Sequence, residues 1–329
     1  MIFKVIEGND PAAWNAVLSK VEAYDFYHTP SYQVLDPIGT ARLLVFEDQG
    51  ACAAIPLIFR PVHNTNRIDV SSVYGYAGWI RTAGFYPETV FSMLRDYFND
   101  QKIISAFSRL HPLIRGSNFF QIGEVSEVNT TLGIDLSLPE QQQWRAYSRS
   151  VRGAILRNKR KGERIVKAES ESDLQHFFRI YREAMTRLKA APHYFFPDSY
   201  FKAVLASPDF ESFVLLAERH GKIIGGALFV ICGSILQYHL GAVANGYLPF
   251  SPLKLLLDEA RLIGIEKKCS VFHLGGGHEG KEDSLFTFKS RMSTSSYSFQ
   301  VWKWIVDEQY YDLLSKNKSS SSFFPAYRA

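Results

Sequence analysis

Two stretches of the chain share one pattern of apolar and polar positions. Residues 43–58 and residues 214–229 each contain an apolar run, a polar turn that ends in glycine (Gly50 and Gly221), and a second apolar run. Apolar runs on either side of a short glycine-containing turn are typical of β-hairpins. The pattern therefore predicts two similar hairpins, one in each half of the chain.

The elements predicted after each hairpin also recur in the same order. They are a Tyr- and Gly-rich strand at 70–79 and 236–247, a helix at 87–100 and 251–264, and a short strand at 103–110 and 270–274. Ser251 is the predicted N-cap of the second of these helices, with Pro252 at its first position and Gly264 just past its end. We interpret the repeat as two α+β units in tandem; chance similarity of the two hairpins is the alternative.

The boundary between these units is predicted from composition. We expect a first domain at 1–145 and a second at 146–329. The second domain would begin with a basic linker helix at 146–164 and end in a peripheral tail at 307–329, which becomes Ser-rich from residue 315. A capping box at Ser172 and Gln175 would start the helix after the linker.

Composition and charge narrow the class of protein. Hydrophobic residues make up 46% of the 329 residues, so each half can bury a core. The net charge is 37 − 33 = +4, too little for a protein that coats nucleic acid. The three cysteines are far apart, the N-terminus has no signal-like apolar stretch, and the apolar run at 223–236 is too short to cross a bilayer. We expect a cytoplasmic protein.

Several familiar motifs are incomplete. Residues 275–281, GGGHEGK, fit a phosphate-binding P-loop, but Glu282 stands where Ser or Thr would hold Mg²⁺. The chain has no G-x-S-x-G elbow. Cys269, His273, His278 and Glu279 match no zinc spacing, so we expect no metal. A glycine-rich turn at Gly275 and Gly276 remains, either open to a ligand or purely structural.

A series of phrases then resembles a known family. The series comprises VYGYAGW (73–79), FSRLHPLI (107–114), HYFFPDSYF (193–201), YHLGA (238–242), LGGG (274–277) and DSLFTFKSRMS (283–293). In this order, over about residues 40–300, the chain resembles the Fem-type aminoacyltransferases of the GNAT-like acyltransferase superfamily. The resemblance implies an α+β fold of two tandem GNAT-like domains, each with a mixed central sheet flanked by helices.

The resemblance also implies acyl transfer from an activated donor to an amine, with no resident cofactor. The donor would be aminoacyl-tRNA or acyl-CoA, and the acceptor a small-molecule or lipid-linked cell-wall precursor. Two departures from the family pattern stand out. No helical-hairpin arm interrupts the second half, and residues 242–254 lack the R/Q-x-x-G-x-G/A loop with which ordinary GNAT enzymes hold acetyl-CoA.

Lys289 is the first candidate for catalysis. By resemblance it is the lysine of the Phe-Lys motif, which stabilises the carbonyl oxygen as negative charge develops there. A lysine within the apolar run LFTFK would also be costly to bury without an anionic partner. The alternative is a lysine at a strand end that reaches solvent.

The remaining substrate-binding candidates in the second half are Arg187, Tyr194 and Tyr238. By resemblance Arg187 would bind a phosphate or carboxylate of the acceptor; otherwise it is a cation at a helix C-terminus. Tyr194 and Tyr238 would line the substrate channel. His239 is a possible general base, but alternation along a strand lets only one of Tyr238 and His239 face the cleft, and we favour Tyr238.

Two further groups have alternative explanations. Tyr74 and Tyr76 would share one face of the first domain and either stack on a sugar or pack between the domains. The basic run that includes Arg157, Lys159 and Arg160 could contact nucleic-acid phosphates or an anionic membrane surface, or it could be a solvated helix face.

The sequence thus favours a metal-free acyl- or aminoacyltransferase acting on an amine of a cell-wall or polysaccharide precursor. Two alternatives stay open: an acetyl-CoA-dependent N-acetyltransferase of an amino sugar or small amine, and a non-catalytic binding protein of the same fold. We expect no transmembrane segment and at most transient contact with a membrane surface.

Overall fold

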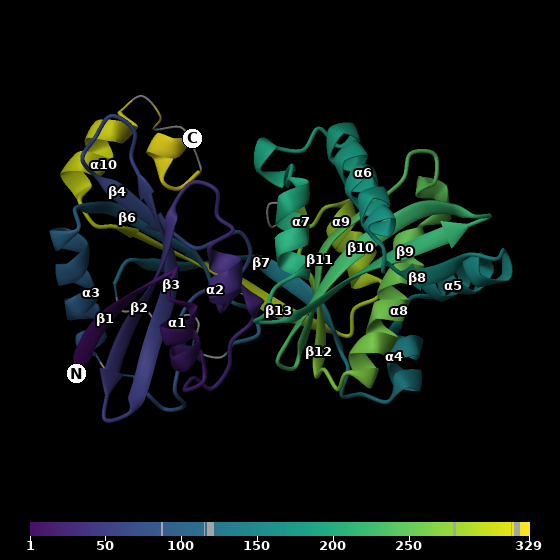
Figure 1. Cartoon of the computed structure of the whole chain (residues 1–329), viewed down its shortest axis with the longest axis horizontal. Coiled ribbons are helices and arrows are strands. Elements are labelled where there is room, and N and C mark those ends of the chain that lie inside the picture. The colour runs from purple at the N-terminus through teal and green to yellow at the C-terminus, as the bar shows by residue number, and fades with distance from the viewer. Residues whose placement is uncertain (87, 115, 117–121, 279–280, 317, 319–322) are drawn as a thin grey trace. The chain divides into compact units, whose positions relative to one another are not determined.

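The computed structural model describes residues 1–86, 88–114, 116, 122–278, 281–316, 318 and 323–329 (Figure 1). Contacts along the chain divide it into two compact units. Unit 1 contains Met1–Asn129 and Ser298–Ala329, and unit 2 contains Thr130–Tyr297. Each unit has its own sheet and is described by itself.

Unit 1 is built on a mixed sheet in which strands lie in the order β1-β2-β3-β4-β6-β13, with β5 paired to β3. The β4–β6 pair is parallel and the other pairs are antiparallel. Its elements are β1 (Ile2–Glu7), α1 (Pro11–Leu18), η1 (Phe26–His28), α2 (Pro30–Gln33), β2 (Thr40–Asp48), β3 (Ala51–Pro61), β4 (Ile68–Ser71), β5 (Ile80–Arg81), α3 (Thr89–Asp100), β6 (Ile103–Arg109), most of β13 (Ser295–Ile305), α10 (Glu308–Ser315) and η5 (Ala326–Arg328).

Unit 2 has a sheet of the same plan, in the order β8-β9-β10-β11-β12-β7. Here the β11–β12 pair is parallel and the others are antiparallel. Its elements are the second half of β7 (Glu124–Asp135), α4 (Glu140–Ala146), α5 (Arg149–Arg160), β8 (Arg164–Lys167), α6 (Glu171–Arg187), η2 (Pro192–Tyr194), α7 (Asp198–Leu205), β9 (Glu211–Arg219), β10 (Lys222–Cys232), β11 (Ile235–Val243), η3 (Leu248–Phe250), α8 (Pro252–Glu266), β12 (Val271–Gly275) and α9 (Ser284–Ser290).

The predicted repeat is present in both sheets. In each, three antiparallel pairings lead to a strand whose parallel neighbour follows through a helix, α3 in unit 1 and α8 in unit 2. The final strand of each sheet comes from the other half of the chain. The C-terminal strand β13 pairs with β6, and β7, which follows β6 in sequence, pairs with β12.

This exchange of strands corrects the predicted domain boundary at 145/146. Residues 130–145 belong to unit 2, because β7 pairs with β12 and the buried Arg261 of α8 donates through Nη1 to Gln143 Oε1 of α4, 3.2 Å away. The basic segment expected as a linker is α5, which packs on α8 within unit 2. Composition could not show this, because a strand has the same apolar pattern whichever sheet it joins.

The predicted peripheral tail is also part of unit 1. Arg328 pairs with the buried Asp69, with Nη2 3.1 Å from Oδ1, and the Tyr327 hydroxyl donates to Asp69 Oδ2 at 3.0 Å. Burial raises the pKa of the Tyr327 hydroxyl, which keeps it protonated as a donor. A buried carboxylate is costly without partners, so these contacts hold the C-terminal segment on the sheet.

Two element boundaries differ from the sequence prediction. Helix α8 begins at Pro252 as expected but continues to Glu266, so Gly264 lies inside it. A Cβ at Gly264 would come within 2.8 Å of Leu136 Cδ1, so glycine there serves close packing and does not end the helix. The capping box of α6 is formed by Ser170 and Asp173, not by Ser172 and Gln175.

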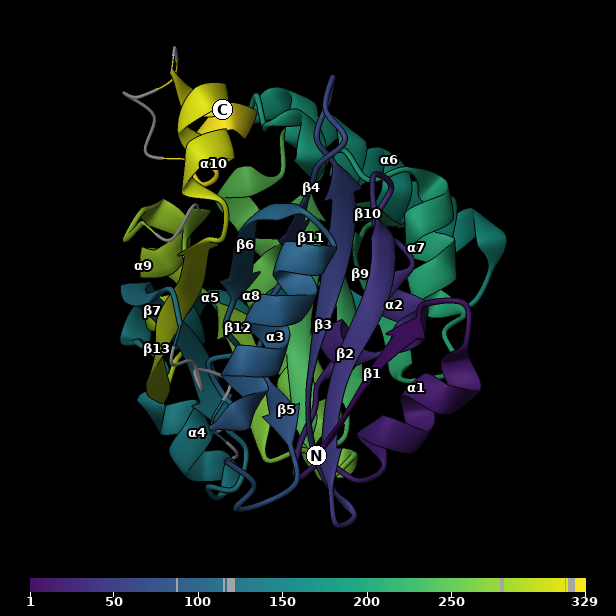
Figure 2. The ribbon, with the colours of Figure 1, turned by 90° about the vertical axis from the view of Figure 1, so that its left-hand side faces the viewer.

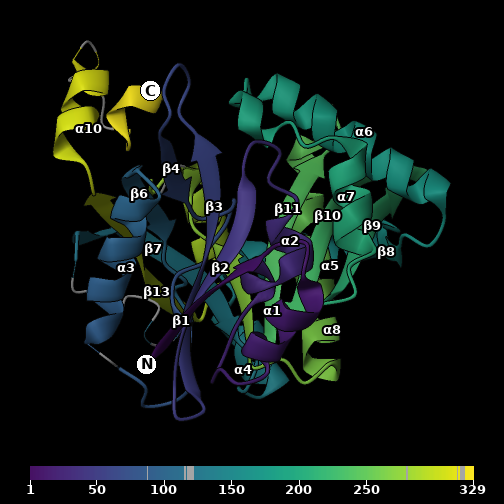
Figure 3. The same cartoon turned by 60° about the vertical axis from the view of Figure 1, so that its left-hand side comes forward.

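The core of unit 1 lies between its sheet and α3. Val90, Leu94 and Phe98 of α3 are fully buried with apolar side chains of β2, β3 and β6. Figure 2 shows α3 lying along these strands, and Figure 3 shows α1 and α2 on the other side of β2 and β3. Both faces of the sheet are therefore covered, as the long apolar runs of β2 and β3 require.

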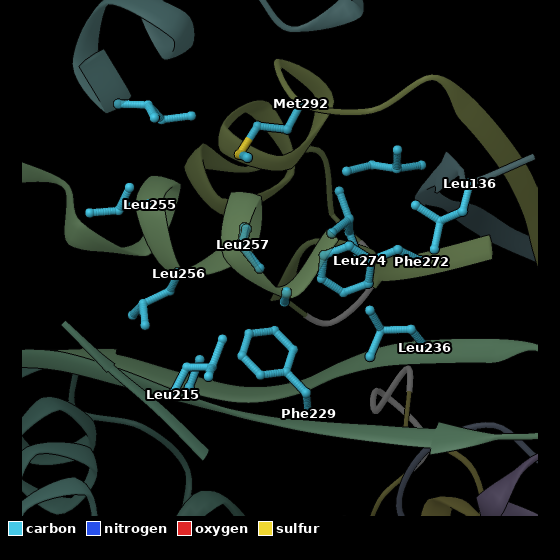
Figure 4. Packing of buried hydrophobic residues seen from close by; sticks show 14 of the residues in the cluster. Leu136, Leu215, Phe229, Leu236, Leu255, Leu256, Leu257, Phe272, Leu274 and Met292 are labelled. Atoms are coloured by element: carbon cyan, nitrogen blue, oxygen red, sulfur yellow. The ribbon is translucent and has the colours of Figure 1, made fainter. Parts of the chain in front are cut away.

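The core of unit 2 lies between its sheet and α8. Figure 4 shows Leu256 and Leu257 of α8 on the same side of the sheet as Phe229 and Leu236, and all four are fully buried. Helices α6 and α7 cover the opposite face. The two faces thus differ in what they pack against, which decides where the side chains of β11 point.

A buried polar cluster lies beneath the tyrosines of unit 1. His111 Nδ1 accepts from the Leu113 amide at 3.2 Å, so Nε2 carries the proton and donates to Asp25 Oδ2 at 2.9 Å. The backbone amide of Asp25 donates to His28 Nδ1 at 3.1 Å. Burial and the nearby His111 lower the pKa of His28 to about 3.

The low pKa of His28 predicts that unit 1 loses stability in mild acid. The unfolded chain binds a proton on this histidine near pH 6.5, whereas the folded chain does so only near pH 3. Stability is therefore complete above the unfolded pKa and falls below it, by about 1.4 kcal/mol per pH unit for this one group. We expect His28→Asn, which keeps an acceptor for the Asp25 amide, to lose this part of the pH dependence in urea unfolding. The same pH dependence in the variant and the wild type would contradict the assignment.

Candidate active site

The sheet of unit 2 separates where its two parallel strands end. The β11–β12 ladder has only three residue pairs and stops at Gln237–His273. Strand β11 continues to Val243 alongside β10, whereas β12 turns toward β7 and pairs Gly275 with Leu132. Among the described residues, positions 238–243 have no ladder partner on the β12 side. Their backbone groups can therefore bind a ligand, at the carboxyl ends of parallel strands where ligands commonly bind.

A β-bulge on β11 marks the start of this open edge. Phe229 faces Tyr238 and Leu228 faces Leu240, which leaves His239 as the extra residue. Tyr238 packs with the α8-side core, whereas His239 Nε2 lies 2.7 Å from the Tyr200 hydroxyl of α7. The two side chains therefore point to opposite faces, as expected from sequence.

The glycine turn after β12 is shaped by close backbone approaches. Gly275 has φ +75° at the end of the strand, a conformation that glycine adopts without strain. A Cβ at Gly277 would lie 1.9 Å from the Lys281 carbonyl oxygen. The turn leads to Asp283, the N-cap of α9, whose Oδ1 accepts from the Phe286 amide at 2.9 Å and Oδ2 from the His278 amide at 3.2 Å. These bonds fix the orientation of α9, which carries Lys289.

The charge on Asp283 is also fixed by this arrangement. Burial alone would raise the pKa of its carboxyl group, but amide donors, including those of Phe286 and His278, outweigh burial and hold the pKa below its usual range. An ionised Asp283 in turn favours the charged form of Lys289. Sequence reasoning missed Asp283, although an Asp immediately before the apolar run SLFTF is a recognisable helix start.

Lys289 is buried and points into the protein. Its side chain lies on α9, and the residue is 6% exposed, so the predicted strand position is wrong and the alternative of a solvent-reaching lysine is excluded. Nζ donates to the Gly276 carbonyl oxygen at 2.7 Å and lies 5.6 Å from the centre of the Tyr238 ring. Burial lowers the pKa of Lys289 to about 7, against the opposing effect of Asp283. Burial also raises the pKa of Tyr238, so its ring stays neutral beside the amine.

Arg187 lies at the other end of the open edge of β11. It is the last residue of α6 and is half-buried. Its Nη2 donates to the Val243 carbonyl oxygen at 3.1 Å, and its Nη1 donates to Asn245 Oδ1. A guanidinium has five N–H donors, and these two bonds set its position where β11 ends.

Tyr194 is brought to the glycine turn by a ring contact. The centre of its ring lies 5.6 Å from that of His278, and its carbonyl oxygen accepts from the Tyr181 hydroxyl at 2.9 Å. The structure therefore brings together the loop of Gly275 and Gly276 with Lys289, Tyr238 and Tyr194. Residues 279 and 280 of this loop, including Glu279, lie outside the described residues.

Tyr74 and Tyr76 lie in unit 1, in a bend beyond β4. The strand expected at 70–79 ends at Ser71, so alternation along a strand does not apply to them. The Tyr74 carbonyl oxygen accepts from the Tyr32 hydroxyl at 2.9 Å, and the Tyr76 ring lies 5.2 Å from that of Phe299. Gly75 between them has φ +117°, and a Cβ there would lie 2.0 Å from the Tyr27 ring.

The three cations of the basic run differ in their surroundings. Arg157 and Arg160 are exposed on α5, whereas Lys159 is directed toward the buried Asp258 of α8, with Nζ 3.9 Å from Oδ2. Asn158, between them, is buried and donates from Nδ2 to the Phe250 carbonyl oxygen at 2.7 Å. The run is thus one exposed helix face and one packed face.

Polar side chains next to the open edge were also missed from sequence. Gln237 and His273 are buried and linked, with Oε1 and Nδ1 2.7 Å apart, and Tyr200 contacts His239 from α7. No motif signals these pairs, because their partners are distant in sequence.

Other kinds of site receive no support within the described ranges. No group of three His, Cys, Asp or Glu side chains there is arranged to hold a metal ion. No helix there is both long and apolar enough to cross a membrane. A cavity of about 330 Å³ in unit 1 is lined by residues that include Arg67 and Asp307, which pair with each other at 3.1 Å.

Comparison with known proteins identifies the class of unit 2. A family model for an acetyltransferase (GNAT) domain matches residues 145–290. This segment is a GNAT-type acetyltransferase domain. The protein is therefore an acyltransferase of the GNAT fold. Searches against curated proteins give no significant match.

Solved structures extend the GNAT likeness over the whole chain. The crystal structure of FemX covers 95% of this chain and 99% of its own, with a TM-score of 0.72 and 13% identity. The C-terminal domain of a putative lysylphosphatidylglycerol synthetase from Agrobacterium fabrum covers 89% and 91%, with a TM-score of 0.59 and 11% identity. A tandem GNAT protein of clavulanic acid biosynthesis covers 92% and 98%, with a TM-score of 0.51 and 8% identity. The predicted tandem GNAT-like, Fem-type fold is confirmed.

The buried amine of the GNAT domain predicts a stability penalty that depends on pH. Unfolding exposes Lys289 and returns its pKa from about 7 to about 10.5, so the unfolded chain binds more protons between these values and stability rises with pH across them. We expect Lys289→Met to be more stable than the wild type by about 3 kcal/mol near neutral pH, after a loss of about 1 kcal/mol for the bond to Gly276. The advantage should shrink toward pH 10 in urea unfolding.

Lys202→Met, at an exposed lysine of α7, is the matched control and should change stability little. A Lys289→Met protein that is less stable than the wild type at neutral pH would show that the amine is not buried at a cost.

Proposed function

We propose that this protein transfers an aminoacyl or acyl group from an activated donor to an amine of a cell-wall or polysaccharide precursor, in the cytoplasm. The observation that carries the proposal is the buried Lys289 amine, held by the Gly276 carbonyl beside the open edge of β11. The likeness to FemX and to a lysylphosphatidylglycerol synthetase domain supports an aminoacyl group over a simple acetyl group.

The reaction places negative charge where Lys289 can stabilise it. The neutral acceptor amine attacks the donor carbonyl carbon, a C–N bond forms, and the carbonyl oxygen becomes an oxyanion. The C–O or C–S bond to the leaving group then breaks, and the proton lost from the amine nitrogen balances the charge on the departing oxygen or sulfur. Because an ammonium has three N–H donors, Lys289 can keep its bond to the Gly276 carbonyl and still donate to the oxyanion.

Binding of the acceptor is assigned to Arg187 and Tyr194. Arg187 is held at the end of β11, and a guanidinium suits a phosphate or carboxylate because its donors match both oxygens. Tyr194 offers an aromatic face next to the glycine turn. In unit 1, Tyr74 and Tyr76 are proposed to stack on a sugar of the precursor.

An acetyl-CoA-dependent N-acetyltransferase is the second candidate, because the matching family model is an acetyltransferase domain. The start of α8 argues against it. Ser251 has φ +51° and forms no side-chain cap, and Pro252 at the first helical position has no N–H to offer a pyrophosphate.

The donor is decided by offering both classes in parallel. Purified protein is incubated with labelled aminoacyl-tRNA or with labelled acetyl-CoA, each with the same panel of amine acceptors. We expect label to move from the aminoacyl-tRNA and Lys289→Ala to lower its transfer by about 10²–10³ with little change in KM, because an oxyanion donor acts mainly in the transition state. Transfer from acetyl-CoA alone would favour the second candidate.

Lys202→Ala is the matched control in this assay, since it removes an exposed lysine of the same unit. Undiminished transfer by a folded Lys289→Ala protein would remove the lysine from the mechanism.

The pH dependence of kcat/KM provides a separate test. The ammonium form of Lys289 is required, and its fraction falls as pH rises through about 7 in the free enzyme. We expect a descending limb near that pH with an acceptor whose own amine is already neutral there. Lys289→Arg should have lower activity and no such limb, because a guanidinium stays protonated. A wild-type profile that still rises above pH 8 would contradict a protonated role.

A further inference from the structure

Helix α5 carries an outward face that contains cations and no acidic residue. Four residues of the helix are buried against the core: Val151, Ala154, Ile155 and Asn158. On the opposite side Arg149, Gly153, Leu156 and Arg160 are exposed at helical spacing, and Arg157 and Lys161 are exposed next to them. The sequence RSVRGAILRNKR of this helix has no Asp or Glu.

Both ends of α5 are anchored to elements that add further cations. At its start, the Ser148 amide donates to the Arg291 carbonyl oxygen at 2.8 Å, at the end of α9. Near its end, Asn158 donates to the Phe250 carbonyl oxygen, just before α8 and its first-turn residue Lys254. Arg149, Arg157, Arg160, Lys161, Lys254 and Arg291 are named here the α5 basic surface (Figure 1).

The charge of the α5 basic surface is not neutralised within the protein. Among the described residues, none of its six members forms an ion pair within 4 Å, whereas Arg164, Arg219 and Arg261 of the same unit do. Burial lowers the pKa of Lys254, and repulsion from Arg291 and Arg157 lowers it further. Cations that repel one another in this way favour an anionic partner from outside the chain.

The dimensions of the surface indicate a polymer. Arg149 and Arg160 are eleven residues apart on one face, which is about 16 Å along a helix and longer than a single phosphate or diphosphate. A Cβ at Gly153, between them, would meet nothing within 4 Å, so a backbone can approach closely there. Only Leu156, 47% exposed, offers apolar surface, which is too little to insert into a membrane.

We propose that the α5 basic surface is a docking site for the phosphate backbone of RNA. Arginine predominates in it, and the planar guanidinium binds two phosphate oxygens at once. The inference rests on the proposed function, in which the donor can be an RNA ester. Arg291 lies two residues after Lys289, so the surface begins at the helix that carries the reacting amine.

The test is direct binding without catalysis. A fluorescein-labelled RNA hairpin with a single-stranded 3′ end is titrated with the full-length protein at several KCl concentrations, followed by anisotropy. We expect the slope of log K against log salt to lose about 2 in Arg149→Gln/Arg157→Gln/Arg160→Gln, because each lost phosphate contact to a single strand removes about 0.7. Affinity near physiological salt should fall about tenfold or more.

A matched triple variant controls for net charge. Arg179→Gln/Lys202→Gln/Lys222→Gln removes the same charge from exposed positions outside α5 and should bind RNA as the wild type does. Circular dichroism establishes that both triple variants are folded. Equal loss of binding in the two would show a general charge effect and overturn the proposal.

Two further measurements separate this inference from the proposed function. Lys289→Ala should bind the hairpin normally and lose acyl transfer, whereas loss of acyl transfer with no RNA binding in any variant would overturn the docking site alone. Vesicles of phosphatidylglycerol and phosphatidylcholine replace RNA in a parallel titration. Binding to these vesicles that depends on the three arginines, without binding to RNA, would assign the surface to a membrane and refute the proposal.

Discussion

The burial of one amino group is the constraint around which unit 2 is organised. A lysine ammonium removed from water is expensive, and the protein provides only partial compensation: one carbonyl oxygen, a tyrosine ring and an ionised aspartate at the start of the same helix. The glycine turn is needed because the Gly276 carbonyl must reach Nζ. A site that serves stability would have used methionine or leucine here, so the amine is retained against stability, which is typical of groups that act in chemistry.

The way the sheet opens explains why the amine is useful. Strand β12 leaves β11 after three pairs, and the turn that follows it carries the carbonyl acceptor of Lys289. The bulge at His239 lets neighbouring residues of β11 face different layers, with Tyr238 toward the lysine and His239 toward Tyr200. One interruption of the ladder thus frees backbone groups, positions an aromatic ring and places a polar pair on the other face.

The fold was more predictable than the site. The two hairpins and the helix after each were predicted because alternating and continuous apolar runs report burial directly. The exchanged strands were not, since the apolar pattern of β7 records that it is buried but not which sheet it joins. Lys289 was found through a motif, yet its helix was mistaken for a strand because LFTF is apolar and β-prone. Asp283 would have corrected this, as the N-cap that fixes α9.

The cations of unit 2 follow two different rules. Arg261 and Arg219 are neutralised by buried carboxylates and serve packing, so their charges do not extend beyond the protein. Those on α5, the first turn of α8 and the end of α9 have no such partners among the described residues, and they adjoin the helix of Lys289. A protein that only needed solubility would intersperse acids on that face. Leaving them out raises the cost of holding the cations together and is compensated when a polyanion binds, so the same economy of charge connects the reacting amine with the surface next to it.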